Sequence, residues 1–101
     1  MEPIQIVMEP RRREILRLVW DRERSAGEIA RHFDRTFGAV SQHLAILREA
    51  GYVTVRKQGN HRYYRADREG LGDLRAVLEA MWASTLERLA ESIEADRGGG
   101  S

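Results

Sequence analysis

Hydrophobic residues recur at helical spacing over most of this chain and alternate with polar residues in one short stretch. The clearest helical stripe has the spacing i, i+4, i+7 and consists of Val40, Leu44 and Leu47. Thr36 is suited to cap the N-terminus of this helix, and Gly51 is suited to end it in the left-handed conformation. We therefore predict a helix over about residues 36–50. Its opposite face carries small or polar residues: Gly38, Ser41, Gln42, Ala45 and Glu49.

Two helices are predicted before this one, near the N-terminus. Apolar residues at helical spacing favour a short helix over residues 3–8, and Pro10 suits the first position of a second helix, to about Trp20. The buried residues predicted for the second helix are Ile15, Leu16, Val19 and Trp20. Arginines at positions 11–13 oppose the helix dipole in its first turn. A solvated charge run and a phosphate or inter-subunit role are both open interpretations of these arginines.

A third helix is predicted to begin at Ser25, because Ser25 and Glu28 have the spacing of a capping box. The buried residues predicted for it are Ile29, Ala30 and Phe33. Only Asp34 and Arg35 separate this helix from Thr36. Two short helices joined by so tight a turn are typical of a helix-turn-helix, whose second helix enters the DNA major groove. The small-residue face of the helix over residues 36–50 suits such a close approach.

The apolar period changes to two after Gly51, which predicts a β-hairpin over residues 53–66. Gly59 and Asn60 tolerate the positive φ of a two-residue turn. Pairing across this turn places Val55 opposite Tyr64, and Val53 opposite Ala66, on the core face. The opposite face receives Thr54, Arg56, Gln58, His61, Tyr63 and Arg65. A hairpin this rich in cations is poorly suited to fold alone, and it fits a wing beside a helix-turn-helix.

A long apolar stripe predicts a last helix over about residues 71–95, followed by a flexible tail at 96–101. A helix of this length spans about 37 Å, whereas a domain of this size has a radius of gyration of only about 13 Å. Apolar groups are therefore left over, which favours a twofold-symmetric homodimer over a helix that wraps its own core. The residues predicted at the dimer interface are Ile4, Leu74, Leu78, Met81, Trp82, Leu86 and Leu89.

Composition bounds the class of protein. At 101 residues, with 42% hydrophobic and 33% charged residues, we expect one mainly α-helical domain over residues 1–95. No apolar run approaches the roughly 20 residues of a membrane span, and the N-terminus lacks a signal-peptide pattern, so we expect a cytoplasmic protein without membrane contact. Zero cysteines exclude a disulfide scaffold, a thiol switch and a thiolate metal site. No constellation of catalytic residues supports an enzyme.

The net charge of +1 hides an uneven distribution. The net charge is 0 over residues 1–30, +5 over residues 31–68 and −4 over residues 69–101. The positive segment contains both the helix over residues 36–50 and the hairpin. This pattern is typical of a double-stranded DNA partner at these two elements.

Four stretches follow one another in a recognisable order: MEPRRREIL at residues 8–16, SAGEIA at 25–30, VSQHL and LREAGYV within 40–53, and GNHRYYR at 59–65. Together they resemble the ArsR (ArsR/SmtB) family of winged-helix repressors, over about residues 3–93. The resemblance implies a mainly α winged helix-turn-helix fold with one hairpin wing and a long C-terminal dimerisation helix. It also implies a homodimer, formed by the first and last helices, that binds an imperfect palindromic operator.

The chain departs from this family at the metal sites. Arg75 stands where a ligand histidine is expected on the last helix, and the three histidines lie on separate elements: His32, His43 and His61. We therefore expect no metal and no cofactor. Phe37 and Gly38 also replace the polar or proline residues usual at the start of the recognition helix. What releases DNA stays open between a small-molecule effector, a protein effector and none.

Eight residues are predicted to contact DNA: Arg35, Thr36, Ser41, Gln42, His43, Arg56, Arg62 and Arg65. Gln42 is the preferred base reader, because its amide can bond an adenine edge bidentately. Arg62 is the least favoured wing residue because the hairpin alternation turns it inward, and helix packing is the favoured role of His43. The alternative function is a winged-helix protein-interaction or architectural module without sequence-specific DNA reading.

Overall fold

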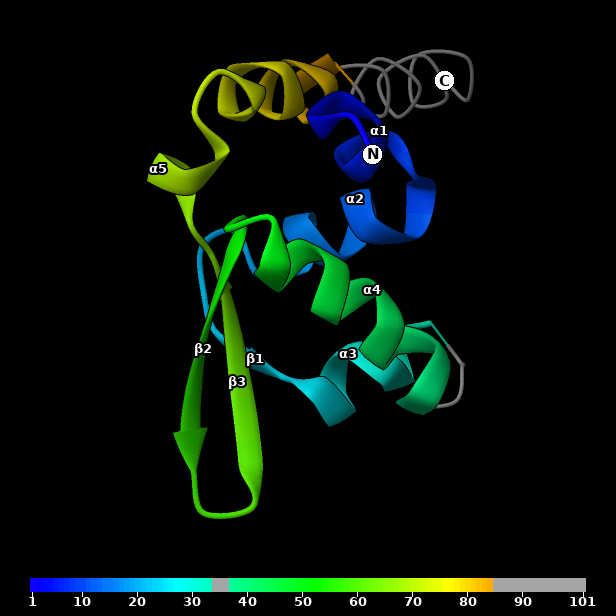
Figure 1. The fold of residues 1–101 in the computed structure, drawn as a ribbon, viewed down its shortest axis with the longest axis vertical. Helices are drawn as coiled ribbons and strands as arrows, with labels where there is room; N and C mark the ends of the chain where they lie inside the picture. The colour runs from blue at the N-terminus through cyan, green and yellow to red at the C-terminus, as the bar shows by residue number, and fades with distance from the viewer. Residues whose placement is uncertain (34–36, 85–101) are drawn as a thin grey trace, which may run out of the picture.

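The computed structural model describes residues 1–33 and 37–84, which form a helical body with a β-hairpin extending from it (Figure 1). The helices are α1 (Pro3–Met8), α2 (Pro10–Leu18), α3 (Ala26–His32), α4 (Phe37–Glu49) and α5 (Arg68–Leu71). Residues 74–84 are also helical. The strands are β1 (Arg24–Ser25), β2 (Val53–Gln58) and β3 (His61–Ala66), in the sheet order β1-β3-β2. The predicted winged helix-turn-helix architecture is confirmed.

The predicted capping box of Ser25 and Glu28 and the predicted place of Pro10 at the start of the second helix are confirmed. The hydroxyl of Ser25 accepts a hydrogen bond from the Glu28 amide at 3.1 Å, and the Glu28 carboxylate accepts one from the Ser25 amide at 3.4 Å. Pro10 opens α2, and the side chain of Glu9 caps it by accepting from the Arg12 amide at 3.0 Å. These bonds satisfy backbone donors that the first helical turn leaves without partners.

A single core lies between the helices and the sheet. The predicted stripes of α2, α3 and α4 are buried there, from Ile15, at 1% exposure, to Leu47, at 0%. Phe33, which is also predicted to be buried, is only half-buried, because it stands at the C-cap of the short helix α3. Tyr64 and Leu78 bring the hairpin and the C-terminal helical segment into the same core.

The hairpin has the predicted register, with Val55 opposite Tyr64 and Val53 opposite Ala66. One strand was not predicted: β1 pairs with β3 in a segment where the sequence indicates only a polar turn. A strand of two residues is too short for alternation to reveal. Its pairing attaches the base of the hairpin to α3, which begins directly after β1.

The C-terminal helix does not begin at Leu71, as the apolar stripe predicts. The short helix α5 ends there, Gly72 adopts a φ of 57°, and a separate helix begins at residue 74. Asp67 caps α5 by accepting from the Gly70 amide at 3.0 Å, and Leu71 is buried. The chain therefore turns sharply after the hairpin before it packs back on the body. The rest of the predicted helix and the tail, residues 85–101, lies outside the described residues.

The helix α1 and the helical residues 74–84 lie at one end of the molecule, and the hairpin turn lies at the other (Figure 1). Three apolar side chains of α1, the residues before it and the C-terminal helical segment are exposed: Met1 at 76%, Ile4 at 43% and Val77 at 42%. Leu78, predicted at a dimer interface, is instead fully buried within its own chain, and Trp82 packs edge-on against Trp20 at 4.7 Å between ring centroids. The burial of Leu78 corrects its predicted place at a dimer interface, because this side chain completes the chain's own core, whereas Trp82 is only half-buried.

Candidate nucleic-acid interface

Helix α4 is held by one face and open on the other. Val40, Leu44 and Leu47 are 4% or less exposed. Opposite them, the exposed positions are Gly38, Gln42, Ala45 and Glu49. The exposed positions of this face among residues 38–45 carry no Lys, Arg, Asp or Glu, so another surface can approach the helix closely. The helix α3 packs against α4, as the second helix of a helix-turn-helix requires.

A groove runs between α4 and the hairpin. Its lining residues are Ser41, Ala45, Arg48, Glu49, Arg62 and Tyr64. Tyr64 is buried at its base, whereas Arg48 and Arg62 are exposed. Arg62 therefore faces α4, on the side that the hairpin alternation predicts. Arg62 and Tyr64 lie on the same face of β3, but Tyr64 is buried and Arg62 is exposed. Arg62 therefore lines the groove and does not enter the core.

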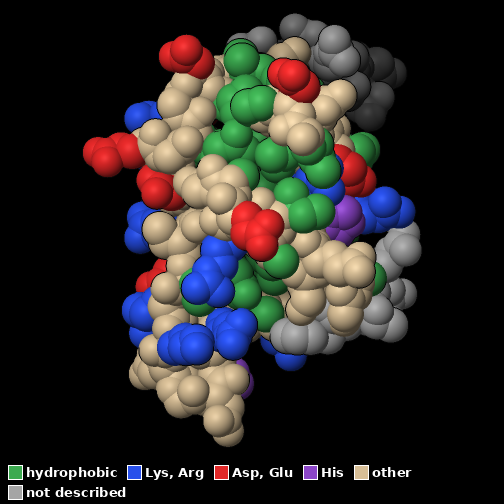
Figure 2. Space-filling view, in the orientation of Figure 1, with side chains coloured by type: hydrophobic (Ala, Val, Ile, Leu, Met, Phe, Trp, Pro, Cys, Tyr) green, Lys and Arg blue, Asp and Glu red, His purple; other side chains and the backbone are tan. Residues whose placement is uncertain are grey.

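Lys57 and Arg62 stand directly opposite each other on β2 and β3, and both are exposed. Directly opposed like charges destabilise an antiparallel pair. Figure 2 shows Lys and Arg side chains gathered over the hairpin side of the molecule. A cationic pair at this position favours an anionic partner, which would relieve the repulsion.

Arg56 lies on the other face of the hairpin and already has partners within the chain. Its Nε donates to Glu23 at 3.0 Å, and its guanidinium lies 4.8 Å from the ring centroid of Tyr63. A further bond joins it to Gln58 at 2.7 Å. Arg65 is exposed at the same face. Of the wing arginines predicted to contact DNA, only Arg62 thus faces the groove beside α4.

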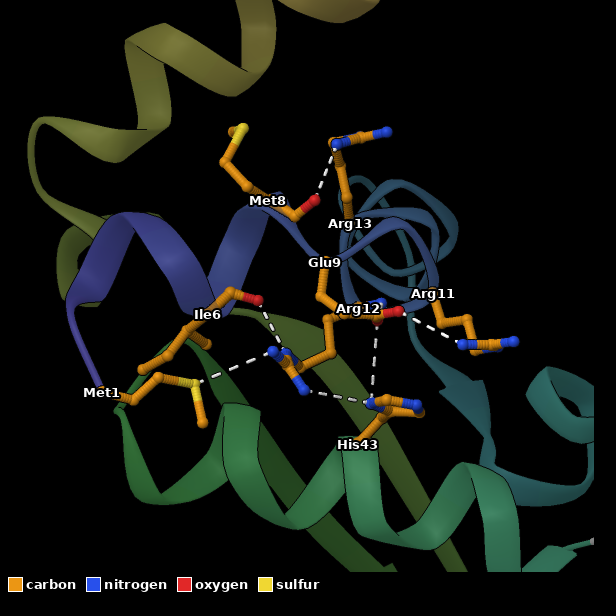
Figure 3. A network of polar contacts seen from close by, with 8 residues as sticks. All are labelled: Met1, Ile6, Met8, Glu9, Arg11, Arg12, Arg13 and His43. Atoms are coloured by element: carbon orange, nitrogen blue, oxygen red, sulfur yellow. Dashed lines mark hydrogen bonds and ion pairs between the residues drawn. The ribbon is translucent and has the colours of Figure 1, made fainter.

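His43 points toward the N-terminus of α2 (Figure 3). Its Nδ1 lies 3.3 Å from a guanidinium nitrogen of Arg12 and 3.8 Å from a carboxylate oxygen of Glu9. Burial lowers the pKa of His43, the Glu9 carboxylate opposes this, and the Arg12 guanidinium adds to the lowering, so that the pKa falls below 6.5. These contacts are those of a residue at a helix–helix junction.

The three arginines at the start of α2 differ from one another. Arg12 is 7% exposed, which overturns the interpretation of a wholly solvated charge run. Arg13 donates to the carbonyl of Met8 at 3.1 Å, and the exposed Arg11 lies 3.4 Å from Glu9. The burial of Arg12 could not be predicted from its position in a run of like charges.

Sequence reasoning also passed over Arg48 and Lys57. Arg48 lies three residues beyond Ala45 on the same face of the helix, and Lys57 pairs with Arg62 in the hairpin. The helical spacing and the hairpin register were therefore enough to predict that both residues lie near the groove. Arg35 and Thr36, both predicted to contact DNA, lie outside the described residues. The candidate interface therefore comprises the open face of α4, the groove and the cations of the hairpin.

No group of three His, Asp or Glu side chains within residues 1–33 and 37–84 is arranged to hold a metal ion. None of the helices in these ranges combines the length and apolarity needed to cross a bilayer.

Known proteins resemble the chain at the same elements. The family model described as bacterial regulatory protein, arsR family, matches residues 9–55, from the N-cap of α2 into β2. The HTH-type transcriptional regulator Rv2034 of Mycobacterium tuberculosis is 34% identical over 92 residues, which cover 91% of this chain and 86% of that protein. The transcriptional repressor SdpR of Bacillus subtilis is 34% identical over 67 residues, covering 66% of this chain and 74% of that protein.

A solved structure extends the likeness to the whole fold. The crystal structure of a "Possible transcriptional regulator for arsenical resistance" matches with a TM-score of 0.70 and 40% sequence identity. The match covers 91% of this chain and 96% of the other. It therefore includes the hairpin and the C-terminal helical segment as well as the helix-turn-helix.

Proposed function

The chain belongs to the arsR family of bacterial regulatory proteins, and from this premise we propose that it is a repressor that binds a palindromic operator as a homodimer. The single observation that carries the proposal is the groove beside α4, where a face of small side chains meets the cations of the hairpin. The family makes it a transcriptional regulator. The arrangement of α4 and the hairpin supports separate roles for the two elements, with base reading by α4 and phosphate binding by the hairpin and the end of α4.

Helix α4 enters the major groove in this proposal, and Gln42 reads a base. Gln42 is exposed on the open face, and an amide can bond an adenine edge with two hydrogen bonds. Ser41, half-buried at the edge of the groove, supplies a short donor to a base or a phosphate. Thr36 and Arg35, which directly precede α4 in the sequence, are proposed to add a short donor and a phosphate contact.

The hairpin and the end of α4 hold the DNA backbone. Arg48 and Arg62 flank one groove, and Lys57 lies opposite Arg62, so a phosphate strand placed there is neutralised from both elements. Arg65, exposed on the other face of the hairpin, is a further phosphate contact. Arg56 requires the release of Glu23 before it can reach DNA.

The dimer forms at the opposite end of the molecule, through α1 and the C-terminal helix. Ile4 and Val77 are exposed there, and Leu74, Met81 and Trp82 are half-buried beside them. Burial of these apolar groups against a second copy supplies the driving force for association. The twofold symmetry of such a dimer matches a palindromic site, with one α4 for each half-site.

Selection of DNA from a random pool of duplexes at moderate salt tests the proposal. We expect one sequence with inverted repeats to be enriched, and the complex to contain two copies of the chain. Enrichment of no sequence would favour the alternative, an architectural or protein-interaction module.

A reporter gene with the selected sequence over its promoter tests the direction of regulation. SdpR, a relative, is named a repressor, and we expect this chain to lower expression in the same way. Increased expression would show that the chain acts as an activator at that site.

A further inference from the structure

The guanidinium of Arg12 joins three helices. Its Nε donates to the carbonyl oxygen of Ile6 in α1 at 2.7 Å, and one terminal nitrogen lies 3.3 Å from Nδ1 of His43 in α4. Arg12 itself belongs to the first turn of α2 (Figure 3). A charged side chain that is only 7% exposed must have such partners, because an unpaired buried charge is costly. Arg12 is thus fixed by α1 and presents a donor to α4.

His43 can accept this donor only as the neutral tautomer that carries its proton on Nε2, because Nδ1 then has a free lone pair. The pKa of His43 is lowered by burial and by Arg12, against the opposing effect of Glu9, which favours the neutral form at pH 7. The carboxylate of Glu9 lies at 3.8 Å, farther from Nδ1 than the guanidinium of Arg12 does. The ring of His43 is therefore held from the N-terminus of α2.

The N-terminal half of α4 has little apolar packing to hold it. Among the described side chains of residues 38–43, only Val40 is buried. A pocket of about 160 Å³ lies beside it, lined by Arg11, Ile15, Phe33, Ala39, Val40, Gln42 and His43. The polar contact of His43 with the N-terminus of α2 is thus a restraint on this half of the helix, beside the burial of Val40 and the packing of α3 against α4. Gln42, the proposed base reader, is the neighbouring residue.

We propose that Arg12 is a positioning residue for DNA reading: by bonding His43, it sets the orientation of the half of α4 that carries Gln42. This inference rests on the proposed function. Arg12 touches no DNA in this arrangement, because it is buried beneath α1 and α4. Loss of the Arg12 side chain should therefore lower the discrimination between DNA sequences and leave the salt dependence of the affinity unchanged.

The test compares four variants with the wild type: Arg12→Met, His43→Leu, the two combined, and His43→Asn, whose amide oxygen replaces the Nδ1 acceptor. The affinity is measured for the duplex selected by the wild type and for a scrambled duplex, at several salt concentrations. Circular dichroism establishes a temperature at which each variant is folded.

We expect Arg12→Met and His43→Leu each to lower the discrimination ratio by about tenfold, as does the loss of one good base contact. The double variant should lose no more than either single one, because both remove the same interaction. His43→Asn should keep most of the discrimination. The slope of affinity against salt should stay at its wild-type value, because no phosphate contact is lost.

Four results would overturn the inference. They are an unchanged ratio with only a lower melting temperature, additive losses in the double variant, a reduced salt slope, and a loss in His43→Asn equal to that in His43→Leu. If Arg12→Met does not fold, the discrimination ratios of His43→Leu and His43→Asn test the inference on their own. A wild type without any preferred duplex would instead overturn the proposed function itself.

Discussion

Gly70 lies against Gly51 where the chain crosses the C-terminus of α4, so closely that a Cβ atom at Gly70 would be 1.9 Å from the Gly51 carbonyl oxygen. The neighbouring atom belongs to the backbone and cannot rotate away. Gly51 itself has a φ of 82° and ends the recognition helix. This contact packs α5 closely against the C-terminus of α4.

We therefore expect Gly70→Ala to lower the free energy of unfolding by about 1 to 3 kcal/mol, the usual cost of an overpacked site. Gly38→Ala is the matched control, because no atom of the described residues lies within 4 Å of a Cβ at that helical position. The control should be neutral or stabilising, since alanine favours helices over glycine. Urea unfolding measures both changes. Equal stability of the two variants would show that the backbone at Gly70 can move aside.

Leu78 and Val77 are adjacent in the chain but differ in exposure, at 0% and 42%. Leu78→Ala should lower the free energy of unfolding of the protomer by about 2 to 5 kcal/mol, as the removal of a fully buried leucine side chain does.

Val77→Glu and Ile4→Glu should leave the fold intact and shift the mass in solution from dimer to monomer. Light scattering after size exclusion measures that mass. A dimer that survives both glutamates would place its interface elsewhere.

His43 makes stability depend on pH. Its pKa is lowered in the folded state by burial, with Glu9 opposing and Arg12 adding to the effect, so the unfolded chain binds its proton more readily. Its contribution to stability is therefore complete above the unfolded pKa of about 6.5 and is lost as the pH falls toward the folded value. His43→Asn should flatten the fall in melting temperature below about pH 6.5. An unchanged profile would contradict this assignment.

Arg62 should contribute to DNA affinity through the phosphates. Arg62→Gln should weaken binding to the selected and the scrambled duplex alike, and lower the salt slope by about 1. It should also stabilise the free protein by about 0.2 to 1 kcal/mol, because the repulsion with Lys57 disappears. Arg56→Gln is the control on the opposite face, where Glu23 and Tyr63 already occupy the guanidinium. A larger loss of affinity in the control would reverse the roles of the two hairpin faces.

The sequence predicted the parts of the fold that depend on local patterns. The stripe of α4, the capping box at Ser25 and the register of Val55 with Tyr64 all follow from spacing and turn residues. It missed the two-residue strand β1 because so short a segment has no measurable period. It missed the break at Gly72 because the apolar stripe continues through the break.

The candidate DNA interface could likewise be predicted only where it depends on local sequence patterns. The open face of α4 and the side on which Arg62 lies follow from periodicity. The burial of Arg12 depends on α1 folding over it, and the pairing of Arg56 with Glu23 joins residues far apart in sequence. Such contacts depend on tertiary structure, and a charged residue gives no sign of them in a one-dimensional pattern.

The central claim is that the open face of α4 reads DNA sequence through Gln42. It is tested most directly by the affinities of wild type and Gln42→Ala for the selected duplex and for a scrambled one, at several salt concentrations. We expect Gln42→Ala to lose about 1 to 3 kcal/mol of binding free energy on the selected duplex and little on the scrambled one, with an unchanged salt slope. Equal weakening on both duplexes would contradict it.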